Sequence, residues 1–118
     1  MGNKFEKLDV WQISHQLVIK IYKTTAQFPK EERFRLGDQL RRSASSIPTN
    51  IVEGSSRVHK KEFAQFLNMA NASLEETKYH LLLAKDLGYL NNGSYQDLQS
   101  QCEKVGRMLF GLSKAIKS

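Results

Sequence analysis

A link of sequence RVHKK, which begins at Arg57, carries the residues best suited to binding chemistry in this chain. It precedes a predicted helix, and the dipole at a helix start disfavours positive charge unless an anion is present. The free N–H groups of a helix start also bind phosphate. Arg57, His59, Lys60 and Lys61 are therefore candidate contacts for nucleic-acid phosphates. The alternative is a solvated link whose charge is partly compensated by Glu62.

Three further arginines lie in the preceding predicted helix. Arg35 and Arg42 are one heptad apart on its solvent face with Asp38 between them, whereas Arg41 is nearer the polar seam described next. An Asp38–Arg42 pair at this spacing would contribute only about a few tenths of a kcal/mol. Phosphate binding by Arg35, Arg41 and Arg42 is the functional interpretation, and solvated charge is the alternative.

A polar seam is expected on the same helix, where Gln39, Asn50 and Glu53 fall on the flank between the apolar and solvent faces. Ser43 and Ser46 lie on this flank as well. Polar groups on a half-buried flank normally need internal partners. We therefore interpret the seam as a structural network that holds one helix or subunit against the next. A pocket for a small ligand or a base edge is the alternative interpretation.

The sequence provides little evidence for a catalytic site. His15, His59 and His80 are far apart and are not at metal-ligand spacing with Cys102. Cys102 falls on an apolar stripe, where a thiol behaves as a small hydrophobe. The Glu-x-x-His pairs of di-iron bundles and a phosphate-binding glycine loop are both missing from the sequence. We expect a protein without catalytic residues, metal or cofactor.

Four blocks with apolar residues at helical spacing must position these groups. They predict helices over about residues 9–28, 31–55, 59–87 and 94–117. Asp9 and Ser94 are plausible N-caps, and Gly88 is a natural end for the third helix. No stretch alternates with a period of two. The pattern predicts an all-α fold, an antiparallel up-down-up-down four-helix bundle, as a single domain over residues 1–118.

Pro48 lies inside the second helical block without breaking its apolar register. A proline removes one backbone hydrogen bond and clashes with the carbonyl four residues earlier, so a kink is expected. We favour one continuous helix kinked at Pro48 over two helices that meet there.

The first predicted helix has a second apolar stripe beside its core stripe. This second stripe includes Trp11, Val18 and Tyr22. A helix in a monomeric bundle needs a narrower apolar face than these two stripes provide. The surplus must either thicken the core or meet another subunit. We expect these three residues to lie in the interface of a homo-oligomer.

The chain has 118 residues, a net charge of +6 and a single cysteine. The positive balance favours a polyanionic partner, although the excess is spread along the chain and forms no basic tail. The N-terminal stretch lacks the apolar run of a secretory signal, and no stretch of about 18 apolar residues could cross a bilayer. We expect a cytoplasmic protein with no membrane partner.

Residues 28–54 resemble the signature region of the family named for proteins encoded in intervening sequences of bacterial 23S rRNA genes. The shared elements are Phe-Pro at 28–29, Gln-Leu-Arg-Arg at 39–42, Ser-Ile-Pro at 46–48, Asn-Ile at 50–51 and Glu-Gly at 53–54. Further matches follow in residues 63–76 and in the LGYL turn at 87–90. Arg35 replaces a glycine of the family and Val52 replaces its usual alanine, and neither departure touches the fold.

The resemblance implies a four-helix bundle that assembles as a homopentamer and has no enzymatic activity. A distant relative, the accessory variability protein of diversity-generating retroelements, is also a pentameric bundle and binds nucleic acid and a reverse transcriptase. Together with the cationic link, this leads to the hypothesis of a non-enzymatic homo-oligomer that binds RNA or DNA through backbone phosphates. The alternative is a protein-interaction or assembly scaffold with no physiological nucleic-acid ligand.

Overall fold

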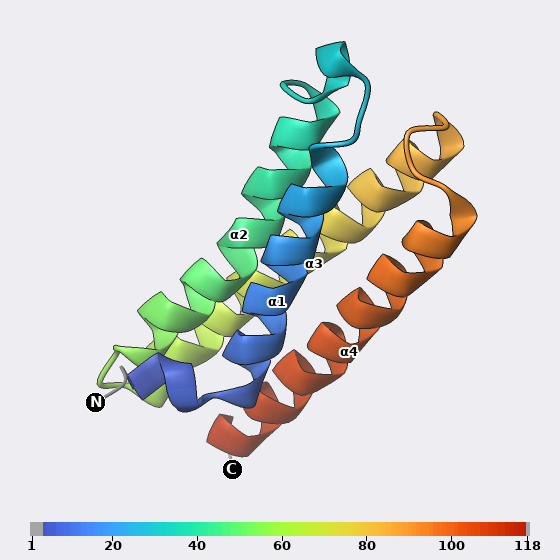
Figure 1. Cartoon of the computed structure of the whole chain (residues 1–118). Coiled ribbons are helices and arrows are strands. Elements are labelled where there is room, and N and C mark those ends of the chain that lie inside the picture. The colour runs from blue at the N-terminus through green and yellow to red at the C-terminus, as the bar shows by residue number, and fades with distance from the viewer. Residues whose placement is uncertain (1–3, 118) are drawn as a thin grey trace.

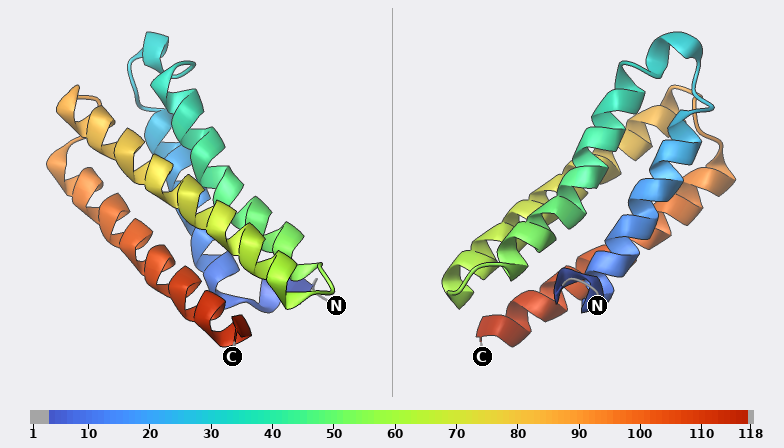
Figure 2. Two further views of the ribbon diagram at one scale, coloured as in Figure 1. Left: turned by 180° about the vertical axis from the view of Figure 1, so that it is seen from behind. Right: turned by 60° about the vertical axis from the view of Figure 1, so that its left-hand side comes forward.

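The computed structural model describes residues 4–117, and every regular element in this part of the chain is helical. Four α-helices form the bundle, preceded and interrupted by two short 3₁₀ turns, in the order η1 (Lys4–Lys7), α1 (Asp9–Thr25), η2 (Lys30–Glu32), α2 (Leu36–Ser55), α3 (Lys60–Asp86) and α4 (Asn92–Lys117). Successive helices run in opposite directions, so α1 begins and α4 ends at the same end of the bundle (Figures 1 and 2). The predicted all-α four-helix bundle is confirmed.

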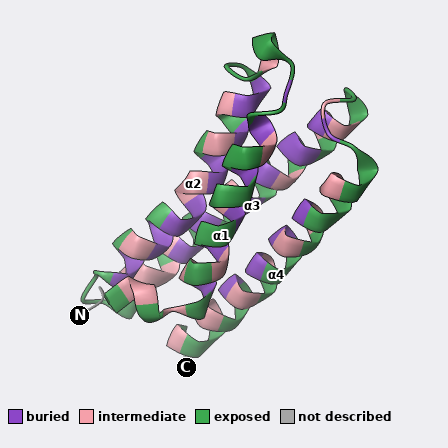
Figure 3. Ribbon diagram, in the orientation of Figure 1, coloured by how far each residue is buried: buried purple, intermediate pink, exposed green. Residues whose placement is uncertain are grey.

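The helices pack as a ring, in which α2 contacts α1 and α3 while α4 contacts α3 and α1. Figure 3 shows that the buried residues gather on the inward faces of all four helices. Leu17, Leu40, Leu74 and Val105 are fully buried, one from each helix. The 3.6-residue periodicity of the sequence therefore reports the core correctly. None of the helices in the described part of the chain is long and apolar enough to cross a membrane.

Two helix boundaries differ from the predicted ones around Pro29. The first helix ends at Thr25 and not at residue 28, although Phe28 is still buried in the core. The second helix begins at Leu36 and not at residue 31, because residues 30–32 form the separate turn η2. The backbone at Arg35 lies outside the helical region, with φ −112° and ψ −97°, and so starts α2 afresh. Apolar periodicity cannot detect such a break, since the stripe continues across it.

The predicted N-caps are wrong. Leu8 occupies the N-cap position of α1, and Asp9 is the first helical residue. At α4 the Asn91 side chain accepts a hydrogen bond of 2.8 Å from the backbone N–H of Ser94, and the helix begins at Asn92. Asn and Ser are both good capping residues, so the sequence alone did not separate them.

Gly88 ends the third helix as predicted. Its φ of +83° lies in the left-handed region that favours glycine. Its N–H donates to the carbonyl of Lys85 at 3.0 Å, and the N–H of Tyr89 donates to the carbonyl of Ala84 at 2.9 Å. This pair of bonds is the Schellman arrangement, which satisfies two carbonyls of the last turn.

The helix α2 is continuous through Pro48, so the alternative of two helices meeting there is wrong. Neighbouring hydroxyls bond within the helix: Ser45 donates to the carbonyl of Arg42 at 3.2 Å and Thr49 donates to that of Ser45 at 2.8 Å. Such bonds supplement a backbone ladder from which proline has removed one donor. The bend expected at Pro48 stays a prediction.

Cys102 lies fully buried in the core, and this burial raises the pKa of its thiol from 9.0 to about 12. We expect the native protein not to react with a disulfide reagent near pH 8, because the thiolate is the reactive species. Since the folded pKa lies above the unfolded value, the stabilising effect of the neutral thiol is complete below pH 9 and declines as the pH rises toward 12. A Ser100→Cys, Cys102→Ala variant, with its thiol on the exposed face, should react at once. Rapid labelling of native Cys102 would contradict this expectation.

Candidate nucleic-acid interface

The link between α2 and α3 follows a helix end whose last carbonyls accept hydrogen bonds from nearby serine hydroxyls. Ser55 donates to the carbonyl of Val52 at 2.9 Å, and Ser56 donates to that of Glu53 at 2.7 Å. The N–H of Arg57 donates to the carbonyl of Gly54 at 3.1 Å. These bonds satisfy carbonyls of the last turn and stop the helix, so the chain turns sharply and presents Arg57 at the end of the bundle.

His59 stands at the N-cap position of α3 in an extended conformation, and its side chain forms no capping hydrogen bond. A helix start leaves several N–H groups without intrahelical partners. Lys60 and Lys61 are both exposed in the first turn, where the positive end of the helix dipole repels them. This helix start therefore combines free N–H groups with two cations, a combination that attracts an anion.

Within the described part of the chain, no carboxylate neutralises the cations of the link. Within the described residues, Arg57, Lys60 and Lys61 form no ion pair with a carboxylate. The guanidinium of Arg57 lies over the ring of Phe66 at 4.8 Å, a cation–π contact that orients it without neutralising it. Glu62, the expected compensating charge, pairs with none of them.

The arginines of α2 form a different surface. Arg42 donates to Asp38 at 2.8 Å, which confirms the expected pair, and Arg35 lies 3.8 Å from Glu32. Both side chains are largely exposed but partly neutralised. Arg42 precedes Ser55, the last residue of α2, by 13 residues, which is about 20 Å along the helix. The structure therefore does not bring these arginines together with the link.

Arg41 serves the fold. Its side chain is 19 % exposed, and its guanidinium donates to the Thr25 hydroxyl at 3.0 Å and to the Arg33 carbonyl at 2.6 Å. The same group lies 5.9 Å from the centre of the Tyr22 ring. These contacts fasten the end of α1 and the η2 turn to α2. We therefore leave Arg41 out of the proposed phosphate-binding surface.

The seam expected from Gln39, Asn50 and Glu53 does not exist as a group of three. Gln39 and Glu53 are exposed, and only Asn50 is buried. Its amide donates to the Ser46 carbonyl at 2.8 Å and to the Ser46 hydroxyl at 3.1 Å. Asn50 is thus satisfied within its own helix, and its expected role in holding one helix or subunit against the next stays a prediction.

A different polar contact, made by hydroxyl groups, joins α2 to α3. Ser73 donates to the Ser46 hydroxyl at 2.9 Å, and Thr77 donates to the Ser43 hydroxyl, also at 2.9 Å. The sequence places Ser43 and Ser46 on the half-buried flank of α2 but does not reveal their partners, because Thr77 falls on the apolar stripe of its helix. The signal was the matching spacing of hydroxyl residues on the two helices.

The expected interface residues of α1 are divided between core and surface. The Trp11 ring stacks on His15 with centres 5.0 Å apart and meets the edge of Phe5 at the same distance. Val18 packs against the core and is partly buried. Tyr22 is 52 % exposed. Trp11 and Val18 of the second stripe therefore pack against the core. Tyr22 is exposed enough to contact another subunit.

Fold and surface together define a small antiparallel four-helix bundle protein with an unpaired cationic link at one end. The chain belongs to the 23S rRNA-intervening sequence protein family, whose sequence pattern matches residues 6–111. It is also similar to the crystal structure of a protein of unknown function from the S23 ribosomal protein family of Bacteroides thetaiotaomicron. The two share 25% identity with a TM-score of 0.80, over 89% of this chain and 98% of the other. No curated protein matches this chain significantly.

Proposed function

We propose that this protein is a non-enzymatic homo-oligomer that binds RNA, or DNA of similar backbone, through its phosphates at the link that contains Arg57, Lys60 and Lys61. The observation that carries the proposal is the presence of three unpaired cations beside an uncapped helix start. Cations and free N–H groups of this kind bind the phosphates of a strand whatever its bases. Binding of this kind fixes position on a strand without specifying its sequence.

In this proposal the backbone N–H groups, the two lysines and Arg57 make different contacts with phosphate. A phosphate oxygen accepts hydrogen bonds from the first N–H groups of α3, while Lys60 and Lys61 neutralise its charge. Arg57 can donate two parallel hydrogen bonds to a neighbouring phosphate, and its position over Phe66 limits the freedom that it loses on binding.

Salt dependence tests this proposal. Three phosphate contacts predict a slope of about −2.7 for log affinity against log salt. The affinity for a paired RNA duplex should therefore fall about 40-fold between 50 and 200 mM salt. Fluorescence anisotropy with a labelled duplex measures this slope. Absence of binding even at about 50 mM salt, where phosphate-driven binding is strong, would contradict the proposal.

Self-association is supported by apolar side chains that the single chain leaves exposed. Ile19 and Tyr22 lie on α1, and Met69 and Tyr79 lie on α3. Five copies is the number that the family resemblance implies, and light scattering measures it. The same exposed residues favour a second candidate function, that of an assembly scaffold in which nucleic acid has no role.

A further inference from the structure

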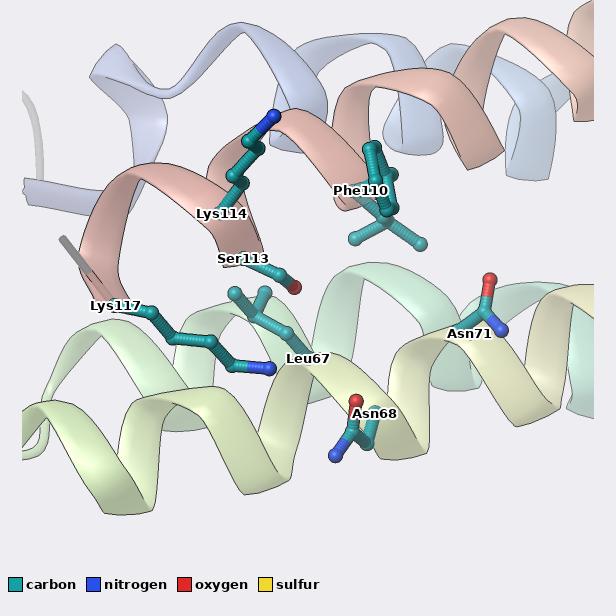
Figure 4. A pocket seen from close by; sticks show the side chains of 8 residues that line it. Leu67, Asn68, Asn71, Phe110, Ser113, Lys114 and Lys117 are labelled. Atoms are coloured by element: carbon teal, nitrogen blue, oxygen red, sulfur yellow. The ribbon is translucent and has the colours of Figure 1, made fainter.

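A groove of about 420 Å³ lies between α3 and α4, on a part of the surface that the cationic link does not include. The buried side chains of Leu67 and Leu109 form its apolar floor. Phe110 stands at its side and is 70 % exposed. Figure 4 shows Phe110 on the α4 side of the groove and Leu67 directed from α3 toward α4. A large exposed aromatic ring beside a hollow is a surface on which a flat, partly apolar group can lie.

The rest of the groove is polar and positively charged. Asn68, Asn71 and Ser113 line it, and their side chains form no hydrogen bond within the described residues. Lys114 and Lys117 complete the lining, in which the described residues supply no carboxylate. In Figure 4, Lys117 reaches from α4 toward α3, while Lys114 stands at the outer edge. The groove thus offers free amides, a hydroxyl and two cations around an apolar floor.

The groove is continuous with the cationic link along α3. Lys60 and Lys61 precede Leu67 and Asn68 by seven residues each, which is about two helical turns. Residues at this spacing share a side of the helix, so both lysines lie on the side that faces the groove. Because α4 runs antiparallel to α3, Lys117 lies toward the same end of the bundle as the link (Figures 1 and 2). Cations therefore extend from the link to the groove.

We propose that this groove binds one unpaired nucleotide of a single-stranded RNA, with the base stacked on Phe110 and the flanking phosphates on Lys114, Lys117 and the link. Unpaired bases stack on aromatic side chains, and every base has a π-face, so this contact needs no particular sequence. The free amides of Asn68 and Asn71 can meet a base edge or a 2′-hydroxyl. The inference rests on the proposed function and deepens it: the link binds phosphate, and the groove selects unpaired strands.

The test compares a labelled uridine-only RNA strand with a paired RNA duplex of equal length. Phe110→Ala should weaken binding of the strand by about 5- to 100-fold, because it removes one stacked base. Binding of the duplex should be unchanged, and the salt slope should be unchanged for both. The matched control is Phe34→Ala. Phe34 is 81 % exposed in the connection before α2, at the other end of the bundle, and its loss should affect neither RNA.

The lysines are tested separately from the ring. Replacing Lys114 and Lys117 by Gln should lower the salt slope for the strand by about 1.4, since each contact with a single strand contributes about 0.7. A strand that carries a photoreactive thiouracil base should crosslink to the peptide that contains Phe110.

The outcomes separate this inference from the function on which it rests. Duplex binding together with equal strand binding by Phe110→Ala and Phe34→Ala would overturn the groove and leave the phosphate-binding link intact. Failure of the wild-type protein to bind either RNA at about 50 mM salt would overturn both. A change in oligomer mass on Phe110→Ala, without a change in strand binding, would instead assign the groove to the contact between copies.

Discussion

Reversing three charges in one variant, Arg57→Glu, Lys60→Glu and Lys61→Glu, should weaken RNA binding by about 100-fold or more at low salt. The change removes three phosphate contacts and puts repulsive carboxylates at the same place. For the paired duplex, the slope of log affinity against log salt should fall toward zero, because few counterions are then released on binding. Anisotropy titrations at several salt concentrations measure both quantities.

The charge reversal should leave the bundle folded. The three side chains form no internal ion pair, so their removal breaks none. Glutamate at the first turn of α3 interacts favourably with the helix dipole and offsets the loss of the cation–π contact at Phe66. Thermal unfolding and oligomer mass should therefore match the wild-type values. A loss of binding in this variant cannot then be ascribed to unfolding.

A second triple variant controls for net charge. Lys23→Glu, Lys30→Glu and Lys104→Glu also change the charge by −6, from +6 to 0, at exposed positions outside the link. Its affinity should stay within about tenfold of the wild type, since it loses long-range attraction but no contact. Equal losses in both variants would mean that binding follows total charge and has no defined site. Retention of all partners by the link variant would favour the scaffold function.

The fold was predictable because local rules determine it. Apolar residues recur every three to four positions in all four helices, and residues such as Leu40 and Ile47 keep the register across the Ser-rich segment up to Pro48. Burial of such a stripe requires packing against neighbouring helices, whatever the details of the connections. The helix ends were less predictable because capping depends on one or two hydrogen bonds, as at Asn91.

The site was only partly predictable, since it depends on which residues meet in space. Arg41 was a candidate for phosphate binding because its partners, the Thr25 hydroxyl and the Arg33 carbonyl, reach it only through the turn at η2. The groove at Phe110 was missed for a similar reason, because it exists only where α3 and α4 lie side by side. The link was found because its charges are consecutive in sequence.

The second large effect is expected at Gly54, where α2 packs against two phenylalanines of α3. A Cβ atom built at this position would lie 2.8 Å from the Cβ of Phe66 and 2.9 Å from Cδ1 of Phe63. The Cβ of Phe66 cannot move without its backbone, so Gly54→Ala must push the two helices apart. Overpacking of this kind costs about 1–3 kcal/mol, or about 4 to 12 °C in Tm. Thermal and urea unfolding measure the loss.

Gly111→Ala is the matched control for this prediction, because the same substitution is made within a helix but a Cβ there meets nothing within 4 Å. Alanine should stabilise that exposed position by about 0.5–1 kcal/mol. Opposite signs for the two variants would show that the close approach, and not helix propensity, decides the effect at Gly54. The guanidinium of Arg57 lies over the Phe66 ring, so displacement of Phe66 in Gly54→Ala should leave the Arg57 side chain less well oriented. The RNA affinity of Gly54→Ala should therefore fall as well. Stability gains of equal size in both variants would refute the tight α2–α3 contact and, with it, the rigid support of the link.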